Sequence, residues 1–184
     1  MSVCENVKGC ATKHIREARR LIAEDEVEKD IRRFLLATYY CLSADSPKGC
    51  WMDQLNKPRN SKLMDVLMLP EELPSWLTQE DLDYYVEQFE RSGLRGPINW
   101  YRNIATNDTH IPEIVNKKFR QPAAFIAGAE DDVLQYAPSW RKTMPGWYED
   151  LRFIQLVDGA GHWVQLEQPE RTNQLIKEFL DQVD

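Results

Sequence analysis

The spacing of apolar residues divides the chain into a helical first part and a second part of alternating strands and helices, which meet near residue 120. Between residues 14 and 42 apolar residues recur at helical spacing, opposite a charged stretch at 24–32. This pattern predicts a helix in two pieces with one inward face. The inward positions are Val27, Ile31, Phe34, Leu35 and Leu42. Prolines then predict a loop-rich connection over 43–75, with one short helix within 63–69.

A further helix is predicted over 78–93, where Thr78 can cap the first turn and Gly93 ends the helix. Its apolar stripe consists of Leu82, Tyr85, Val86 and Phe89. A turn follows, and Pro97 stands near the first position of another short helix over Ile98–Ile104.

The pattern changes after residue 120. The continuous apolar run 123–127 is typical of a strand buried on both faces, and 152–157 is a second strand. A crossover helix is expected within 138–148, and an amphipathic helix begins at Pro169. That last helix places Leu175, Ile176, Phe179 and Leu180 on one face. The order strand, helix, strand, helix predicts a parallel βαβα unit.

Composition excludes several classes of protein. The 184 residues are 42% apolar and 29% charged, which is typical of a globular domain, and the net charge of −7 disfavours nucleic acid as a partner. No run of 18 apolar residues predicts a membrane span. The first 20 residues are basic without the apolar core of a secretory signal, so we expect a cytoplasmic protein. The sequence specifies no oligomeric state.

Cysteine spacing points to no metal site. Cys4, Cys10, Cys41 and Cys50 all lie in the first 50 residues, and none forms a C-x-x-C pair. We therefore expect free thiols and neither a metal nor another cofactor.

The candidate chemistry follows the two predicted strands. Asp131 comes shortly after the first strand, and His162 stands in a glycine-rich loop after the second. Because parallel strands end at one edge of a sheet, these loops can bring a carboxylate against an imidazole and make a general base. An Asp followed by a His, with a nucleophile upstream, is the order of α/β-hydrolases. The alternative is that His162 is a surface or capping residue and Asp131 a solvated turn residue.

Two longer segments carry a family resemblance. The run LTQEDLDYYV at 77–86, with Phe89 and SGLRGPINWYRN at 92–103, closely resembles the cap signature of the α/β-hydrolase-type soluble epoxide hydrolases. FIAG at 125–128 and GHW at 161–163 are similar to the acid and base loops of that family.

The resemblance extends from about Ala23 to the C-terminus and implies the α/β fold class, as a partial α/β-hydrolase fold. Residues 1–22 are then a divergent N-terminal segment. The resemblance assigns 23–118 to a helical cap and 119–184 to the C-terminal part of the hydrolase core.

In that family, an aspartate opens the epoxide and forms an ester, and a His–Asp pair activates the water that releases a vicinal diol. The resemblance implies that His162 is the general base, Asp131 the acid that orients it, and Tyr101 a cap tyrosine that holds and protonates the epoxide oxygen. It also implies a small apolar epoxide as substrate. Asp132 is the alternative acid, Tyr101 can instead serve packing, and Tyr84 and Tyr85 are expected to pack within the cap.

The sequence departs from the family upstream of the cap. It contains no G-x-D-x-G, no G-x-S-x-G and no His-Gly-x-Pro, and the segment with the second cap tyrosine is missing. We therefore expect a truncated hydrolase without epoxide-opening activity of its own. Two other interpretations stay open. One is a non-catalytic cap that serves as an interaction module. The other is a dehalogenase-type α/β-hydrolase, against which Tyr101 argues because a phenol suits an epoxide oxygen.

Overall fold

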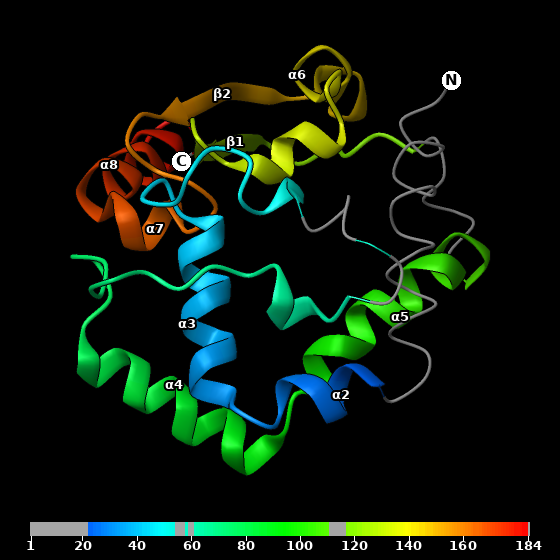
Figure 1. Ribbon diagram of the computed structural model, residues 1–184. Coiled ribbons are helices and arrows are strands. Elements are labelled where there is room, and N and C mark those ends of the chain that lie inside the picture. Colours follow the sequence, from blue (N-terminus) through cyan, green and yellow to red (C-terminus); the bar gives the residue numbers. More distant parts are fainter. Residues whose placement is uncertain (1–21, 54–57, 59–60, 111–116, 184) are drawn as a thin grey trace.

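The structure is a computed structural model and describes residues 22–53, 58, 61–110 and 117–183. Helices dominate the first part of the chain, and a two-stranded sheet with its helices forms the second (Figure 1). The elements in chain order are α2 (Ile22–Val27), α3 (Ile31–Leu42), η2 (Leu63–Asp65), α4 (Gln79–Ser92), α5 (Arg95–His110), β1 (Ala123–Gly128), η4 (Asp132–Tyr136), α6 (Trp140–Thr143), η5 (Met144–Trp147), β2 (Leu151–Val157), α7 (Val164–Glu167) and α8 (Pro169–Leu180).

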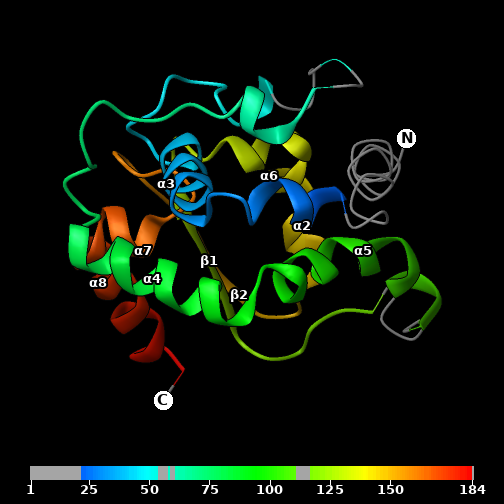
Figure 2. The same cartoon turned by 60° about the horizontal axis from the view of Figure 1, so that its bottom comes forward.

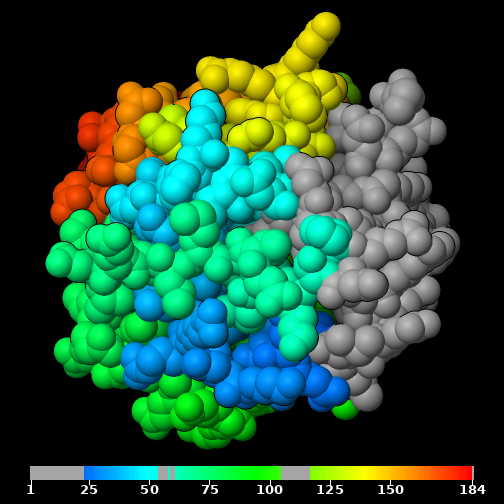
Figure 3. Space-filling model, viewed as in Figure 1, coloured from blue at the N-terminus to red at the C-terminus, as the bar shows by residue number. Residues whose placement is uncertain are grey.

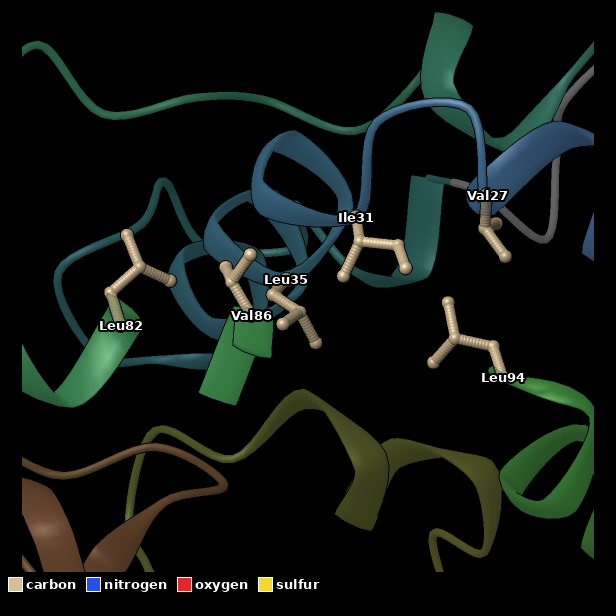
Figure 4. Close-up of a cluster of buried hydrophobic side chains, with 6 residues drawn as sticks. All are labelled: Val27, Ile31, Leu35, Leu82, Val86 and Leu94. Atoms are coloured by element: carbon tan, nitrogen blue, oxygen red, sulfur yellow. The ribbon is translucent and has the colours of Figure 1, made fainter. Parts of the chain in front are cut away.

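The core of the helical part lies where α3 crosses α4. Six buried side chains from α2, α3, α4 and the turn before α5 meet there (Figure 4). They are Val27, Ile31, Leu35, Leu82, Val86 and Leu94. The predicted break in the first helix is confirmed, because Asp30 caps α3 by accepting a hydrogen bond from the N–H of Arg33 at 2.9 Å. Residues 14–21 of that prediction lie outside the described residues.

The loop-rich connection covers α3 from one side. The segment 61–77 runs across the front of α3 in Figure 1, and Figure 3 shows its atoms over that face. Leu67 from this segment is buried with Ala37, Cys41 and Cys50. The predicted short helix is confirmed as the single 3-10 turn η2.

The start and end of α4 match the sequence prediction. The hydroxyl of Thr78 accepts from the N–H of Asp81, whose carboxylate accepts from the N–H of Thr78, and Gly93 ends the helix at φ 69°. The next helix is longer than predicted, because α5 begins at Arg95 and reaches His110. Pro97 fits this earlier start, because the N–H groups in the first turn of a helix have no acceptor within the helix and proline therefore loses no hydrogen bond there.

The sheet consists of β1 and β2 in parallel, with Gly128 opposite Val157 at the shared carboxyl edge. Helix α8 packs on both strands. The prediction that β1 is buried on both faces is wrong for its first four residues, and only Ala127 and Gly128 are buried. A sheet of two strands leaves each strand with one neighbour, so the first four residues of β1 are only partly buried.

The connections of the βαβα unit are helical, as predicted, but short. The crossover from β1 to β2 contains the 3-10 turn η4, the short helix α6 and the 3-10 turn η5, which includes Pro145. Helix α8 buries Leu175, whereas Ile176 and Leu180 of the predicted inward face are 43% and 51% exposed. The buried face of α8 is therefore narrower than the apolar face that the sequence predicts.

Candidate active site

Asp131 and His162 meet at the carboxyl edge of the sheet. Atom Nδ1 of His162 lies 3.1 Å from Oδ2 of Asp131, and the side chains are 38% and 8% exposed respectively. The other carboxylate oxygen, Oδ1, accepts the N–H of Val133 at 2.8 Å, because Asp131 caps η4. The turn thus fixes the carboxylate, and the imidazole keeps its Nε2 edge for a substrate or water.

Asp132 takes a different role from its neighbour. Its side chain is buried, and its Oδ1 accepts from Nε2 of Gln135 at 2.8 Å. Of the two adjacent carboxylates, the structure therefore pairs Asp131 with the imidazole and directs Asp132 into η4.

Close backbone packing brings the two loops together. A side chain at Gly128 would place Cβ 2.1 Å from the carbonyl oxygen of Gly161 and 2.2 Å from that of Ala160. Gly161 in turn lies against the end of α3, where an added Cβ would be 2.5 Å from the carbonyl oxygen of Leu42. Both positions require glycine on steric grounds.

Two glutamates that the sequence analysis did not select hold the loop after β2. Glu130 accepts from the N–H groups of Gly159 and Ala160 at 3.4 and 3.2 Å. Glu167 accepts from those of Gly161 at 2.9 Å and Trp163 at 3.0 Å, and also from Ala44 at 2.8 Å. Burial raises the pKa of Glu167, and these three hydrogen bonds oppose that shift. Glu167 lies five residues after His162 in the short helix α7, and no periodic pattern in the sequence marks it.

An aromatic group links the loop to the helical part. The indole N–H of Trp163 donates to the carbonyl oxygen of Tyr39 at 2.9 Å, and the two rings lie 4.7 Å apart. Tyr39 also stacks on Tyr85 at 5.6 Å, and burial raises the pKa of Tyr39 to about 12. Tyr85 packs within the helical part as predicted, whereas Tyr84 is 59% exposed with one edge against Tyr85.

Tyr101 lies apart from the Asp131–His162 pair. Its ring is 58% exposed on α5, beside an open surface hollow lined by Gly96, Pro97 and Trp100. Figures 1 and 2 place α5 on the opposite side of α3 from α7, which follows the histidine. The structure thus brings together two of the three predicted site residues.

The described residues contain no cluster of three or more histidine, cysteine, aspartate or glutamate side chains that could hold a metal ion. In the same part of the chain, no helix is long and apolar enough to cross a membrane. The two described cysteines, Cys41 and Cys50, are free thiols as predicted, and Cys4 and Cys10 lie outside the described residues.

The helical part, the parallel βαβα unit and the Asp–His pair at the strand ends define a partial α/β-hydrolase fold. A solved epoxide hydrolase from an endophytic Streptomyces superposes with a TM-score of 0.81 at 32% identity, over 86% of this chain and 48% of that one. Epoxide hydrolase A from Mycobacterium thermoresistibile gives 0.79 at 33% identity, over 93% of this chain and 52% of the other.

Sequence comparison agrees, although no family model matches the chain. Epoxide hydrolase A of Mycobacterium tuberculosis is 38% identical over 161 residues, which are 86% of this chain and 48% of that protein. Bifunctional epoxide hydrolase 2 of Rattus norvegicus is 32% identical over 86% of this chain and 27% of its own length. The chain belongs to the epoxide hydrolase family of the α/β-hydrolase fold. It spans about half the length of the first mycobacterial relatives that it matches.

Proposed function

We propose that this chain carries the water-activating part of an epoxide hydrolase site, with His162 as general base and Asp131 as the acid that orients it. The contact of 3.1 Å between Nδ1 and Oδ2 carries the proposal, because it leaves Nε2 free to accept a proton. The imidazole is also sufficiently exposed for a water molecule to reach it.

In the proposed step, Nε2 of His162 takes a proton from water while the oxygen attacks the carbonyl carbon of an aspartyl ester. The bond between this carbonyl carbon and the ester oxygen then breaks, and the ester oxygen takes the proton from the imidazolium and leaves as a hydroxyl of the diol. The water oxygen stays on the carboxylate, and the aspartate is regenerated. Asp131 stabilises the imidazolium that forms between these two events.

The proposed function also assigns the boundaries of the site. Residues 23–118 are the cap, with Tyr101 as a proton donor to the oxygen of a small apolar epoxide, and 119–184 are the end of the hydrolase core. The exposed phenol of Tyr101 is compatible with this role. A nucleophile has to come from outside these 184 residues, since they contain no G-x-D-x-G. The chain by itself should therefore form no diol from an aryl epoxide.

A chimera tests the base directly. Residues 119–184 replace the corresponding end of epoxide hydrolase A of Mycobacterium tuberculosis, and diol formation and the mass of the enzyme are followed. The parent chimera should turn over, whereas its His162→Ala variant should stop after one equivalent of covalent ester. His162→Ala turnover equal to that of the parent chimera would refute the proposed base. Gln165→Ala, a substitution at an exposed position three residues after His162, is the matched control and should turn over like the parent chimera.

A further inference from the structure

The backbone of the loop around His162 is held by hydrogen bonds to other segments of the chain. Five consecutive backbone N–H groups, from Gly159 to Trp163, all donate to side-chain or main-chain oxygens outside the loop. Glu130 accepts the first two, Glu167 accepts the third and fifth, and the carbonyl of Leu42 accepts that of His162 at 2.9 Å.

Glu167 holds the backbone on both sides of the histidine. Its Oε2 accepts from Gly161 and from Ala44, and its Oε1 accepts from Trp163. Hydrogen bonds to an ionised carboxylate are stronger than neutral ones, and two that flank one residue restrict its backbone dihedral angles. The bond to Ala44 ties the same carboxylate to the chain just after α3.

Glu130 is the weaker of the two supports. Its hydrogen bonds to the N–H groups of Gly159 and Ala160 are longer, at 3.4 and 3.2 Å, and Glu130 is an exposed residue. Glu167 makes three bonds of 2.8–3.0 Å in a half-buried position. The orientation of the imidazole toward Asp131 therefore depends chiefly on Glu167.

We infer that Glu167 is a positioning residue for the base: it fixes the backbone of His162 so that Nδ1 stays on the carboxylate of Asp131. This inference rests on the proposed function of His162. Its structural consequence is separate from turnover, because a hydrogen bond from Nδ1–H to Asp131 selects one tautomer of the neutral imidazole.

The test measures that tautomer in the full chain by long-range ¹H–¹⁵N correlation of the imidazole nitrogens, with the signals assigned through His162→Asn. Glu167→Gln keeps the shape of the side chain but presents an NH₂ group to one of the three donors. Glu170→Gln, an exposed position on α8, is the control for the loss of one negative charge. The same pair of substitutions is repeated in an Asp131→Ala background.

We expect the Nδ1–H tautomer in the parent chain and in Glu170→Gln, and a mixture with at least about a third Nε2–H in Glu167→Gln. In the Asp131→Ala background, Glu167→Gln should cause no further change, because the effect acts through the pair. An unchanged tautomer in Glu167→Gln overturns the inference, as does an equal change in both backgrounds. Nε2–H in the parent chain contradicts instead the proposed arrangement of the base.

Amide hydrogen exchange of the parent chain needs no variant. The N–H groups of Gly161 and Trp163 should exchange about tenfold more slowly than that of Gly159, which has the longest bond to a glutamate. Equal exchange rates at these three positions would overturn the role of Glu167 even if Glu167→Gln failed to fold.

Discussion

The backbone N–H of His162 donates to the carbonyl oxygen of Leu42 over 2.9 Å, so the loop after β2 is bonded to the last residue of α3. The two elements lie at opposite ends of the sequence, and the contact crosses the boundary proposed between cap and core. A carbonyl at the end of a helix lacks an intrahelical donor. The histidine loop supplies this donor, and the position of the candidate base thereby depends on the helical part.

Replacement of Gly161 by alanine should separate these two segments. The new Cβ would lie 2.5–2.8 Å from backbone atoms of Leu42, Ser43 and Ala44. We expect a loss of about 1–3 kcal/mol in the free energy of unfolding, measured by urea denaturation. Gly146→Ala is the matched control, because nothing lies within 4 Å of the added Cβ, and it should be nearly neutral. Equal stability of both variants would contradict the close packing of the loop on α3.

The hydrogen bond from the indole of Trp163 to Tyr39 can be removed without loss of the ring. Trp163→Phe keeps an aromatic contact but deletes the N–H donor that lies 2.9 Å from the carbonyl oxygen. We expect a cost of about 1–2 kcal/mol in thermal or urea unfolding. Trp100→Phe, at a position that is 78% exposed, should change stability by less than about 0.5 kcal/mol. A larger effect at Trp100 than at Trp163 would count against the link between the histidine loop and the helical part.

The sequence was sufficient for the elements that local signals specify. Thr78 and Gly93 delimit α4 because capping and positive φ are local requirements, and the glycine-rich loop placed His162 near the end of a strand. It was insufficient where the chain folds back on itself. Glu167 meets Ala44 across most of the sequence, and no periodicity encodes that contact. The partial burial of β1 likewise depends on how many strands surround it, and the apolar run of β1 alone does not predict that number.

The thiol of Cys41 should be unreactive in the folded chain. Burial, together with the adjacent thiol of Cys50, raises the pKa of Cys41 to about 12, and only the thiolate is nucleophilic. A variant with Cys4→Ser and Cys10→Ser leaves these two buried thiols as the only ones in the chain. At pH 8, an aromatic disulfide reagent should label the folded variant at least about a hundredfold more slowly than the urea-unfolded one. Rapid labelling of the folded variant would contradict the burial of the pair.

The ion pair between Glu24 and Arg102 should make the free energy of unfolding depend on pH in the acidic range. The two side chains are 2.6 Å apart and largely buried, and the hydrogen bond from Arg102 holds the pKa of Glu24 below its ordinary value against the effect of burial. A lowered pKa in the folded state means that the unfolded chain binds the proton more tightly. The stabilisation is therefore complete above the ordinary pKa of 4.5 and is lost as the pH falls through the folded value.

Glu24→Gln removes this titration and weakens the bond, so we expect it to cost about 1–3 kcal/mol at pH 7 and progressively less below about pH 4.5. Urea denaturation across pH 3–7 measures both effects. Asp25→Asn changes an exposed neighbour in α2 by the same charge and is the control. If the difference between the parent chain and Glu24→Gln stayed constant down to pH 3, the pair could not be the source of the acid dependence. Convergence of the two curves at low pH would assign this part of the acid dependence to the carboxylate of Glu24, which joins α2 to α5.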